Sequence, residues 1–227
     1  MKKLQNKINR KYMQRLQNIL IAMSMLLSVT AAWSCSESDD ENTEEYANWQ
    51  VRNEGFFATL EDSLKNDAAH WKKIKCYTKD EKTPGQNYEY IYAKVLEASD
   101  YLSSPIFTDT VRVAYRGRLL PSLTYSEGYV FDQTYVGKYN FDLTSVIDGT
   151  VSSFTSGFAT ALLHMHKEDR WLIYVPHQLA YGATGTTGIP AYSTLIFDVT
   201  LIDFTTGDGD LYPWNSRELL KGESNDF

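Results

Sequence analysis

The fold that this sequence predicts is decided by WLIYVPHQLAYG (residues 171–182) and by ATGTTGIPAYSTLIFDV, which follows it (residues 183–199). A strand-like run leads into a Tyr-Gly turn, a glycine-rich loop follows, and a second strand-like run closes the stretch. The stretch holds no obvious nucleophile, metal cluster or phosphate-binding loop. A loop that carries aromatic side chains between two hydrophobic strands indicates a shaped apolar pocket rather than acid, base or metal chemistry.

The segments around this stretch predict further strands. Val111, Val113 and Tyr115 fall on one face of residues 110–117, which is the alternation of a strand with one buried face. Three other runs are rich in aromatic and β-branched residues and also predict strands: residues 88–96, 129–135 and 194–204. The last run is apolar on much of both faces, which predicts a central strand.

A short helix is predicted over residues 154–165. Phe158, Leu162 and Met165 form its apolar face, and Ser156 is placed to cap its N-terminus. Combined with the strands, this helix predicts an α+β fold, in which a twisted antiparallel sheet wraps on one short α-helix.

The charge of the chain is uneven. Its 227 residues carry a net charge of −7, yet residues 1–34 contain six Lys or Arg and no acidic residue. The remainder therefore holds 16 basic and 29 acidic residues, a net charge of −13. Such a body repels phosphate backbones, so a nucleic-acid partner is excluded from the expectations.

The start of the chain predicts export. A basic segment to about Arg15 precedes an apolar run over residues 19–33, which fits a secretory signal and is too short to span a bilayer. The run ends in Ala-Trp-Ser before Cys35, which resembles the lipobox of bacterial lipoproteins, although Trp33 fits it less well. Acyl chains on Cys35 would anchor the protein without spanning the membrane. The alternative is an ordinary signal peptide that is cut nearby.

Composition divides the rest of the chain. Residues 36–45 are polar and acidic, which predicts a disordered tether; they also resemble the export signal of some Gram-negative surface lipoproteins. Apolar residues at helix-like spacing predict a helical segment over residues 48–75. The predicted organisation is a signal peptide (1–34), a tether (35–47), a helical extension with a first strand (48–107), the sheet domain (108–204) and a solvated tail (205–227).

Residues 108–204 resemble the FKBP family of peptidyl-prolyl cis-trans isomerases. The pieces that carry the resemblance, in order, are VAYRGRL (113–119), VFD (130–132), GFATAL (157–162) with Met165, WLIYVP (171–176), LAYGATG (179–185) and IPAYSTLIFDV (189–199). The family fold is a twisted antiparallel sheet wrapped on a short helix, which agrees with the strands and helix predicted above. The resemblance covers less than half of the chain.

The resemblance implies an aromatic substrate pocket. Its substrate-binding residues would be Tyr115, Phe131, Phe141, Phe154, Phe158, Ile189 and Phe197. Tyr181 would donate its hydroxyl to the substrate carbonyl, the backbone N–H of Thr155 would be a second donor, and Asp132 would set the local field. Phe158 would form the floor, where the family commonly has tryptophan. The element before the floor has a rival match in VIDG (146–149), but residues 154–157 are preferred because residues 158–182 then align without a gap.

The implied chemistry needs few polar groups. Rotation about an X-Pro bond faces a barrier of roughly 18–20 kcal/mol because twisting removes amide resonance, but no covalent bond breaks. A dry pocket that binds the twisted amide more tightly than the planar one lowers this barrier without a cofactor or a metal. The resemblance therefore implies an isomerase acting on proline-containing polypeptides, with macrolides as candidate inhibitors.

Plainer interpretations remain for the same residues. Aromatic residues on strands are most often core residues, and Asp132 alone would be a surface acid. His164 and His166 diverge on a helix, which disfavours a metal site. His177 follows Pro176 in a loop and is expected to be exposed.

Three functions stay open at this point. The first is an active isomerase for exported proteins in the envelope of a Gram-negative bacterium, lipid-anchored to the outer membrane. The second is an FKBP-like peptide-binding module or chaperone with weak or no catalysis, which Phe158 and Thr155 keep open, whereas Tyr181 and Asp132 favour the first. The third is a surface lipoprotein that uses residues 46–107 to contact a partner.

Overall fold

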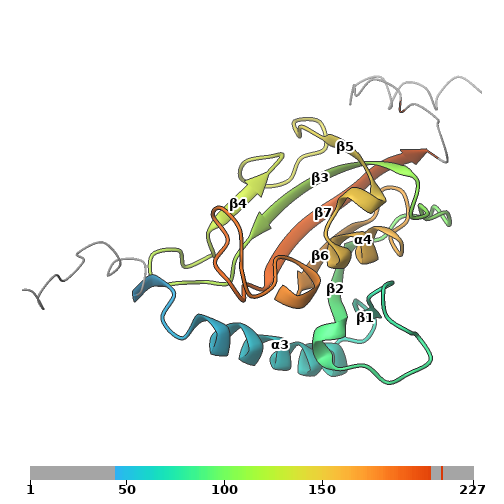
Figure 1. Cartoon of the computed structure of the whole chain (residues 1–227). Coiled ribbons are helices and arrows are strands. Elements are labelled where there is room, and N and C mark those ends of the chain that lie inside the picture. The colour runs from blue at the N-terminus through green and yellow to red at the C-terminus, as the bar shows by residue number, and fades with distance from the viewer. Residues whose placement is uncertain (1–43, 206–210, 212–227) are drawn as a thin grey trace, which may run out of the picture. The chain divides into compact units, whose positions relative to one another are not determined.

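The computed structural model describes residues 44–205 and residue 211, and within them the strands form one antiparallel sheet (Figure 1). The strand order is β1-β2-β6-β7-β3-β4, and β5 pairs with β3. The strands are β1 (Trp71–Lys75), β2 (Tyr90–Glu97), β3 (Thr110–Arg118), β4 (Val130–Gln133), β5 (Ile147–Thr150), β6 (Arg170–Val175) and β7 (Leu195–Thr205). The helices are α3 (Trp49–Asn66) and α4 (Ser156–Leu162), with short 3-10 turns η1 (Asn87–Glu89), η2 (Val151–Ser153) and η3 (His177–Leu179).

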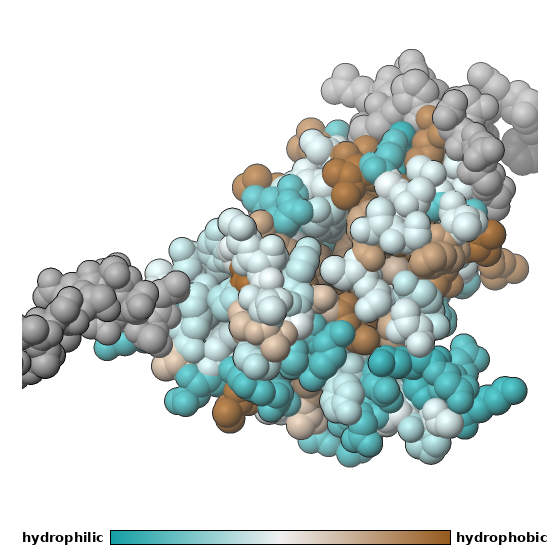
Figure 2. Space-filling model, in the orientation of Figure 1, coloured by the Kyte–Doolittle hydropathy of each residue, from teal (hydrophilic) through white to brown (hydrophobic). Residues whose placement is uncertain are grey.

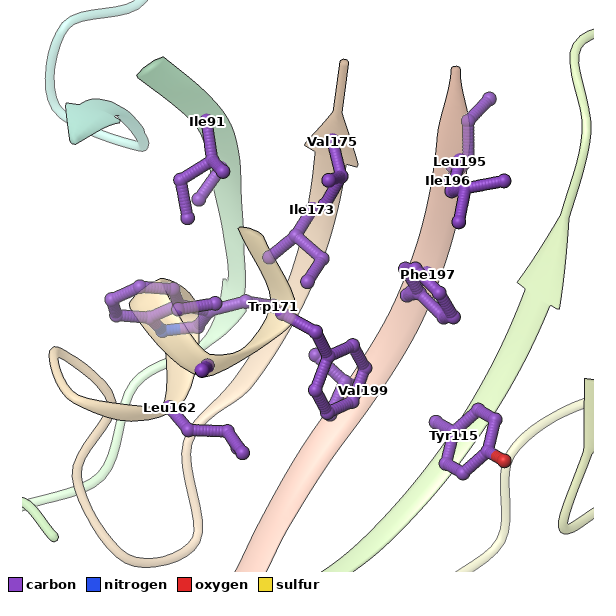
Figure 3. Close-up of a cluster of buried hydrophobic side chains, with 14 of the residues drawn as sticks. Ile91, Tyr115, Leu162, Trp171, Ile173, Val175, Leu195, Ile196, Phe197 and Val199 are labelled. Carbon is purple, nitrogen blue, oxygen red and sulfur yellow. The ribbon is translucent and has the colours of Figure 1, made fainter. Parts of the chain in front are cut away.

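The predicted α+β fold, an antiparallel sheet with a short helix, is confirmed. Strand β7 pairs with β6 on one side and with β3 on the other, so it is central as expected. Helix α4 buries Phe158 and Leu162 among the side chains of β6 and β7. Figure 3 shows Leu162 of α4 facing the row of apolar side chains on these strands. This layer of buried apolar side chains is the main core.

Helix α4 begins one residue away from its predicted cap. Thr155 is the N-cap residue, and no side chain caps the helix. Ser156 instead donates its hydroxyl to the backbone carbonyl of Leu179 at 3.2 Å. The expectation that Ser156 caps α4 is therefore wrong, because this hydroxyl ties the helix to turn η3.

The helix predicted over residues 48–75 is only partly present. Helix α3 ends at Asn66, and Trp71–Lys75 forms strand β1, paired with β2. The spacing of Trp71 and Ile74 fits one helix face as well as it fits a short strand, so periodicity alone could not separate the two. Residues 71–75 form a strand because their backbone pairs with β2. Tertiary pairing here overrides the local pattern.

Strand β2 is buried on both faces. Ile91 and Ala93 belong to the main core, whereas Tyr92 between them packs against Phe57 and Leu60 of α3. Neighbouring side chains of a strand point to opposite faces. Helix α3 therefore covers the face of the sheet opposite α4, and the extension that carries α3, β1 and β2 shares one sheet with the rest of the fold.

The predicted signal peptide, Cys35 and nearly all of the predicted tail lie outside the described residues. Residues 44–47, at the end of the predicted tether, belong to the described part of the chain. Both carboxylate oxygens of Glu45 accept hydrogen bonds from Thr124, and the ring of Tyr46 lies 4.9 Å from that of Trp49. In the part of the chain that the structure describes, no helix has the length and apolar character needed to cross a membrane.

Candidate functional site

Four aromatic rings from four elements meet on the α4 side of the sheet. Phe197 of β7 is central, with its ring centroid 4.9 Å from Phe158 of α4, 5.5 Å from Phe131 of β4 and 6.1 Å from Tyr115 of β3. All three contacts are edge-to-face, the arrangement that the charge distribution of aromatic rings favours. Figure 3 shows Phe197 and Tyr115 side by side on the neighbouring strands β7 and β3. The structure thus brings together the proposed walls and floor of the pocket.

Gly117 gives these rings their space. It lies opposite Phe197 in the β3–β7 pairing, two residues after Tyr115. A Cβ atom at this position would stand 2.6 Å from the ring of Phe131 and 2.9 Å from that of Phe197. Gly117 is not among the pocket residues predicted from the sequence, although a glycine inside a strand pattern is a recognised sign of a close approach.

The floor is extended by a second phenylalanine. Phe154 stacks on Phe158 with ring centroids 5.0 Å apart, directly before α4. The rival segment, residues 146–149, instead contributes to β5, whose residues pair with the first half of β3. The geometry therefore supports the match of Phe154 and Thr155, since Phe154 reaches the aromatic cluster.

One polar pair borders the aromatic cluster. The hydroxyl of Tyr115 donates to the carboxylate of Asp132, which is exposed at the end of β4. Burial raises the pKa of Tyr115 well above its ordinary value, and the hydrogen bond to Asp132 raises it further. The phenol therefore stays protonated at neutral pH and holds the carboxylate at the rim of the pocket.

The two proposed donors lie on loops. Tyr181 follows turn η3, is 40% exposed, and is near enough to Tyr115 to contribute to the raised pKa of that phenol. Thr155 stands at the N-terminus of α4, and its backbone N–H has no acceptor among the described residues. Both groups are thus available to a ligand, although their roles stay predictions.

The remaining predicted pocket residues differ in burial. Ile189 is 5% exposed and joins the main core at the loop after Tyr181. Phe141 is half-buried in the connection between β4 and β5, and its part in the pocket stays a prediction.

His177 departs from its expectation. It is half-buried rather than exposed, and its ring lies 5.1 Å from that of Tyr192. Burial lowers the pKa of this imidazole, so its neutral form is favoured. Among the described residues, no group of three His, Cys, Asp or Glu side chains is arranged to hold a metal ion.

The antiparallel sheet thus carries, on the side covered by α4, a cluster of aromatic rings with one polar pair, Tyr115 and Asp132, beside it. A family model described as FKBP-type peptidyl-prolyl cis-trans isomerase matches residues 103–202. These residues are therefore similar to the FKBP-type peptidyl-prolyl cis-trans isomerase family.

Several curated proteins are similar to this chain. The FKBP-type peptidyl-prolyl cis-trans isomerase FkpA of Escherichia coli is 29% identical over 168 residues, which cover 74% of this chain and 57% of the relative. The macrophage infectivity potentiator of Trypanosoma cruzi is 39% identical over 54% of this chain and 57% of the relative. The isomerase Mip of Coxiella burnetii is 41% identical over 48% of this chain and 42% of the relative. The matches thus span about half the length of these relatives, from 42% to 57%.

A solved structure supports the fold. The crystal structure of a peptidyl-prolyl cis-trans isomerase from Pseudomonas syringae superposes with a TM-score of 0.50 at 22% identity. The match covers 71% of this chain and 96% of the solved one. At 22% sequence identity this structural similarity supports the fold and does not show the activity.

Proposed function

We propose that this protein is a peptidyl-prolyl cis-trans isomerase that acts on X-Pro bonds of exported polypeptides. The observation that carries the proposal is the cluster of Tyr115, Phe131, Phe158 and Phe197, which is apolar except for the Tyr115–Asp132 pair at its rim. A proline ring fits such a cluster because the pocket offers aromatic surface and few groups that would hold water. The match of residues 103–202 to the FKBP-type family model supports the same assignment.

The proposed mechanism is non-covalent. Water stabilises the planar, polar amide, so moving the X-Pro bond among aromatic side chains weakens that stabilisation. The hydroxyl of Tyr181 and the backbone N–H of Thr155 hold the substrate carbonyl while the bond rotates. Asp132, kept in place by Tyr115, contributes a negative charge beside the twisting amide. The site accelerates rotation to the extent that it binds the twisted amide more tightly than the planar one.

The replacement Tyr181→Phe tests this mechanism. It removes one hydroxyl from a 40% exposed side chain, so the fold should be unaffected. Loss of one hydrogen bond in the twisted state is expected to lower kcat/KM about five- to tenfold. Phe131→Ala, which removes a pocket wall, is expected to lower kcat/KM further and mainly through KM. The measurement is a protease-free isomerisation assay of an X-Pro tetrapeptide with the mature protein.

The exposed Tyr125 provides the matched control, since its ring packs on Tyr129 and not on the four clustered rings, so Tyr125→Phe should leave the rate unchanged. A macrolide inhibitor that competes for the proline pocket should suppress the wild-type rate. A wild-type rate equal to background at micromolar enzyme would overturn the isomerase proposal. It would leave the peptide-binding module, which Phe158 in the place of the family's usual tryptophan favours.

We further propose that the protein is lipid-anchored through Cys35 in the envelope of a Gram-negative bacterium, at the outer membrane. The basic start, the apolar run and the position of Cys35 directly after that run support this proposal. In a Gram-negative host fed radiolabelled palmitate, Cys35→Ala is expected to lose the label. The replacement Cys76→Ala is the control and should keep it, because Cys76 is a buried free thiol. Equal labelling of the wild type and Cys35→Ala would rule out lipidation at Cys35.

A further inference from the structure

Helix α3 reaches the loop that carries two proposed pocket residues. We call residues 181–194 the pocket loop, since it begins at Tyr181 and contains Ile189. The indole N–H of Trp49 donates to the hydroxyl of Ser193 at 2.8 Å, and the backbone N–H of Thr194 donates to the Asn53 side-chain carbonyl at 2.7 Å. Trp49 is 6% exposed and Asn53 is 1% exposed, so both hydrogen bonds are shielded from water.

These two contacts form a continuous set of hydrogen bonds. The hydroxyl of Ser193 donates onward to the carbonyl of Pro190 at 2.7 Å. The side-chain amide of Asn53 donates back to the carbonyl of Trp49 at 2.7 Å. Buried polar groups are costly when left without partners. The side chains of α3 therefore satisfy the polar groups at the end of the pocket loop.

Contacts within the pocket loop carry this restraint toward the pocket. The backbone N–H of Tyr192 donates to the carbonyl of Gly182 at 3.0 Å, directly beside Tyr181. Thr186 and Ile189 exchange two backbone hydrogen bonds of 2.9 Å. Tyr192 has a φ of 63°, a left-handed conformation that a tyrosine adopts only when its surroundings hold it there. The position of residues 192–194 thus determines where Tyr181 and Ile189 lie.

The polar contacts matter more because packing beside them is incomplete. A cavity of about 360 Å³ lies between α3 and turns η1 and η3, with Asn53 and Thr194 in its wall. Trp49, one turn earlier on the helix, packs into the main core that also contains Ile189. At the cavity the Asn53–Thr194 hydrogen bond links the helix directly to the end of the loop.

We propose that Trp49 and Asn53 are positioning residues for the isomerase reaction, with α3 acting as a clamp on the pocket loop. This inference rests on the function proposed above and adds to it that the extension before the FKBP-type domain takes part in catalysis. The residues do not touch the substrate. They act through the loop that places the Tyr181 hydroxyl and the Ile189 side chain at the pocket.

The test compares Trp49→Phe and Asn53→Ala with the wild type in the full chain. Trp49→Phe keeps an aromatic ring but removes the N–H, and Asn53→Ala removes the acceptor for Thr194. Each variant is measured by amide hydrogen exchange of residues 181–194 and by kcat and KM on an X-Pro tetrapeptide. Faster exchange of the loop and a lower kcat/KM, each by about fivefold, are expected from the loss of one buried hydrogen bond.

The matched control is Leu60→Val on the same helix. Leu60 is buried beside Tyr92, is not in the wall of the cavity, and makes no hydrogen bond to the pocket loop. This change should lower the stability of the fold while leaving loop exchange and both kinetic constants at wild-type values under folding conditions. A double mutant of Trp49→Phe with Ser193→Ala should lose no more than Ser193→Ala alone, because both changes remove the same contact.

The following results would contradict the proposed role of Trp49 and Asn53. Unchanged loop exchange in both variants would overturn the clamp. Faster exchange with a wild-type kcat/KM would overturn the positioning role while the isomerase function stands. An inactive wild-type protein would instead defeat the proposed function and the catalytic role of the clamp together. In that case the exchange data would still show whether α3 restrains the loop.

Discussion

Replacing Phe197 with alanine is expected to destabilise the fold by about 3–5 kcal/mol and to remove isomerase activity. Phe197 is 7% exposed and its ring contacts three other aromatic rings, so alanine leaves a cavity that rigid strands cannot close. The same ring is a proposed wall for the substrate proline. The measurements are the free energy of unfolding in urea and the isomerisation rate at a temperature at which the variant is folded.

The matched control for this change is Phe204→Ala on the same strand. Phe204 is only half-buried and lies beyond the aromatic cluster. Its loss is expected to cost less in stability and to spare the rate of the folded protein. A Phe197→Ala variant within about 1 kcal/mol of the wild type would contradict the central place given to this ring.

Gly117→Ala is expected to abolish or nearly abolish isomerisation while the chain still folds. Its backbone needs no left-handed conformation, so the whole effect comes from the added methyl group. This group would stand 2.6 Å from the ring of Phe131 and 2.9 Å from that of Phe197, which forces both rings out of place. Such overpacking typically costs about 1–3 kcal/mol of stability. The measurements are kcat/KM for an X-Pro tetrapeptide and the unfolding midpoint.

Gly55→Ala serves as the matched control. Gly55 lies in helix α3, and a Cβ atom there would meet nothing within 4 Å. This change is expected to stabilise the protein by up to about 1 kcal/mol, because glycine is a poor helix residue, and to leave activity unchanged. Wild-type kcat/KM in Gly117→Ala would show that the pocket does not use the space beside β3.

The structure also changes how the part of the chain before the FKBP-type match is understood. Strands β1 and β2 extend the same sheet beyond β6, and α3 covers the face of β2 that carries Tyr92. Residues 45–205 lie in one compact unit rather than in an appendage and a domain. This arrangement brings α3 next to the pocket loop, where Trp49 and Asn53 form the hydrogen bonds of the proposed clamp.

The sequence alone predicted the sheet-and-helix fold and the aromatic residues of the proposed pocket. Residues 110–117 alternate between apolar and polar side chains, and residues 194–204 form a long apolar run. Both patterns are local, so β3 and β7 could be predicted from the sequence. The aromatic pocket residues came from the resemblance in residues 108–204, in which order and spacing are preserved. The left-handed loop glycines Gly182, Gly185 and Gly188 also lie where the sequence placed a turn-rich loop.

Tertiary structure alone decided the other features. Trp71 and Ile74 fit a helix and a strand equally well, and only pairing with β2 selects β1. Ser156 could cap a helix, but its hydroxyl goes to Leu179, 23 residues away. The contact between Trp49 and Ser193 joins residues 144 positions apart. Local patterns predict elements because neighbouring residues share one backbone, whereas these choices depend on partners that only the folded chain brings together.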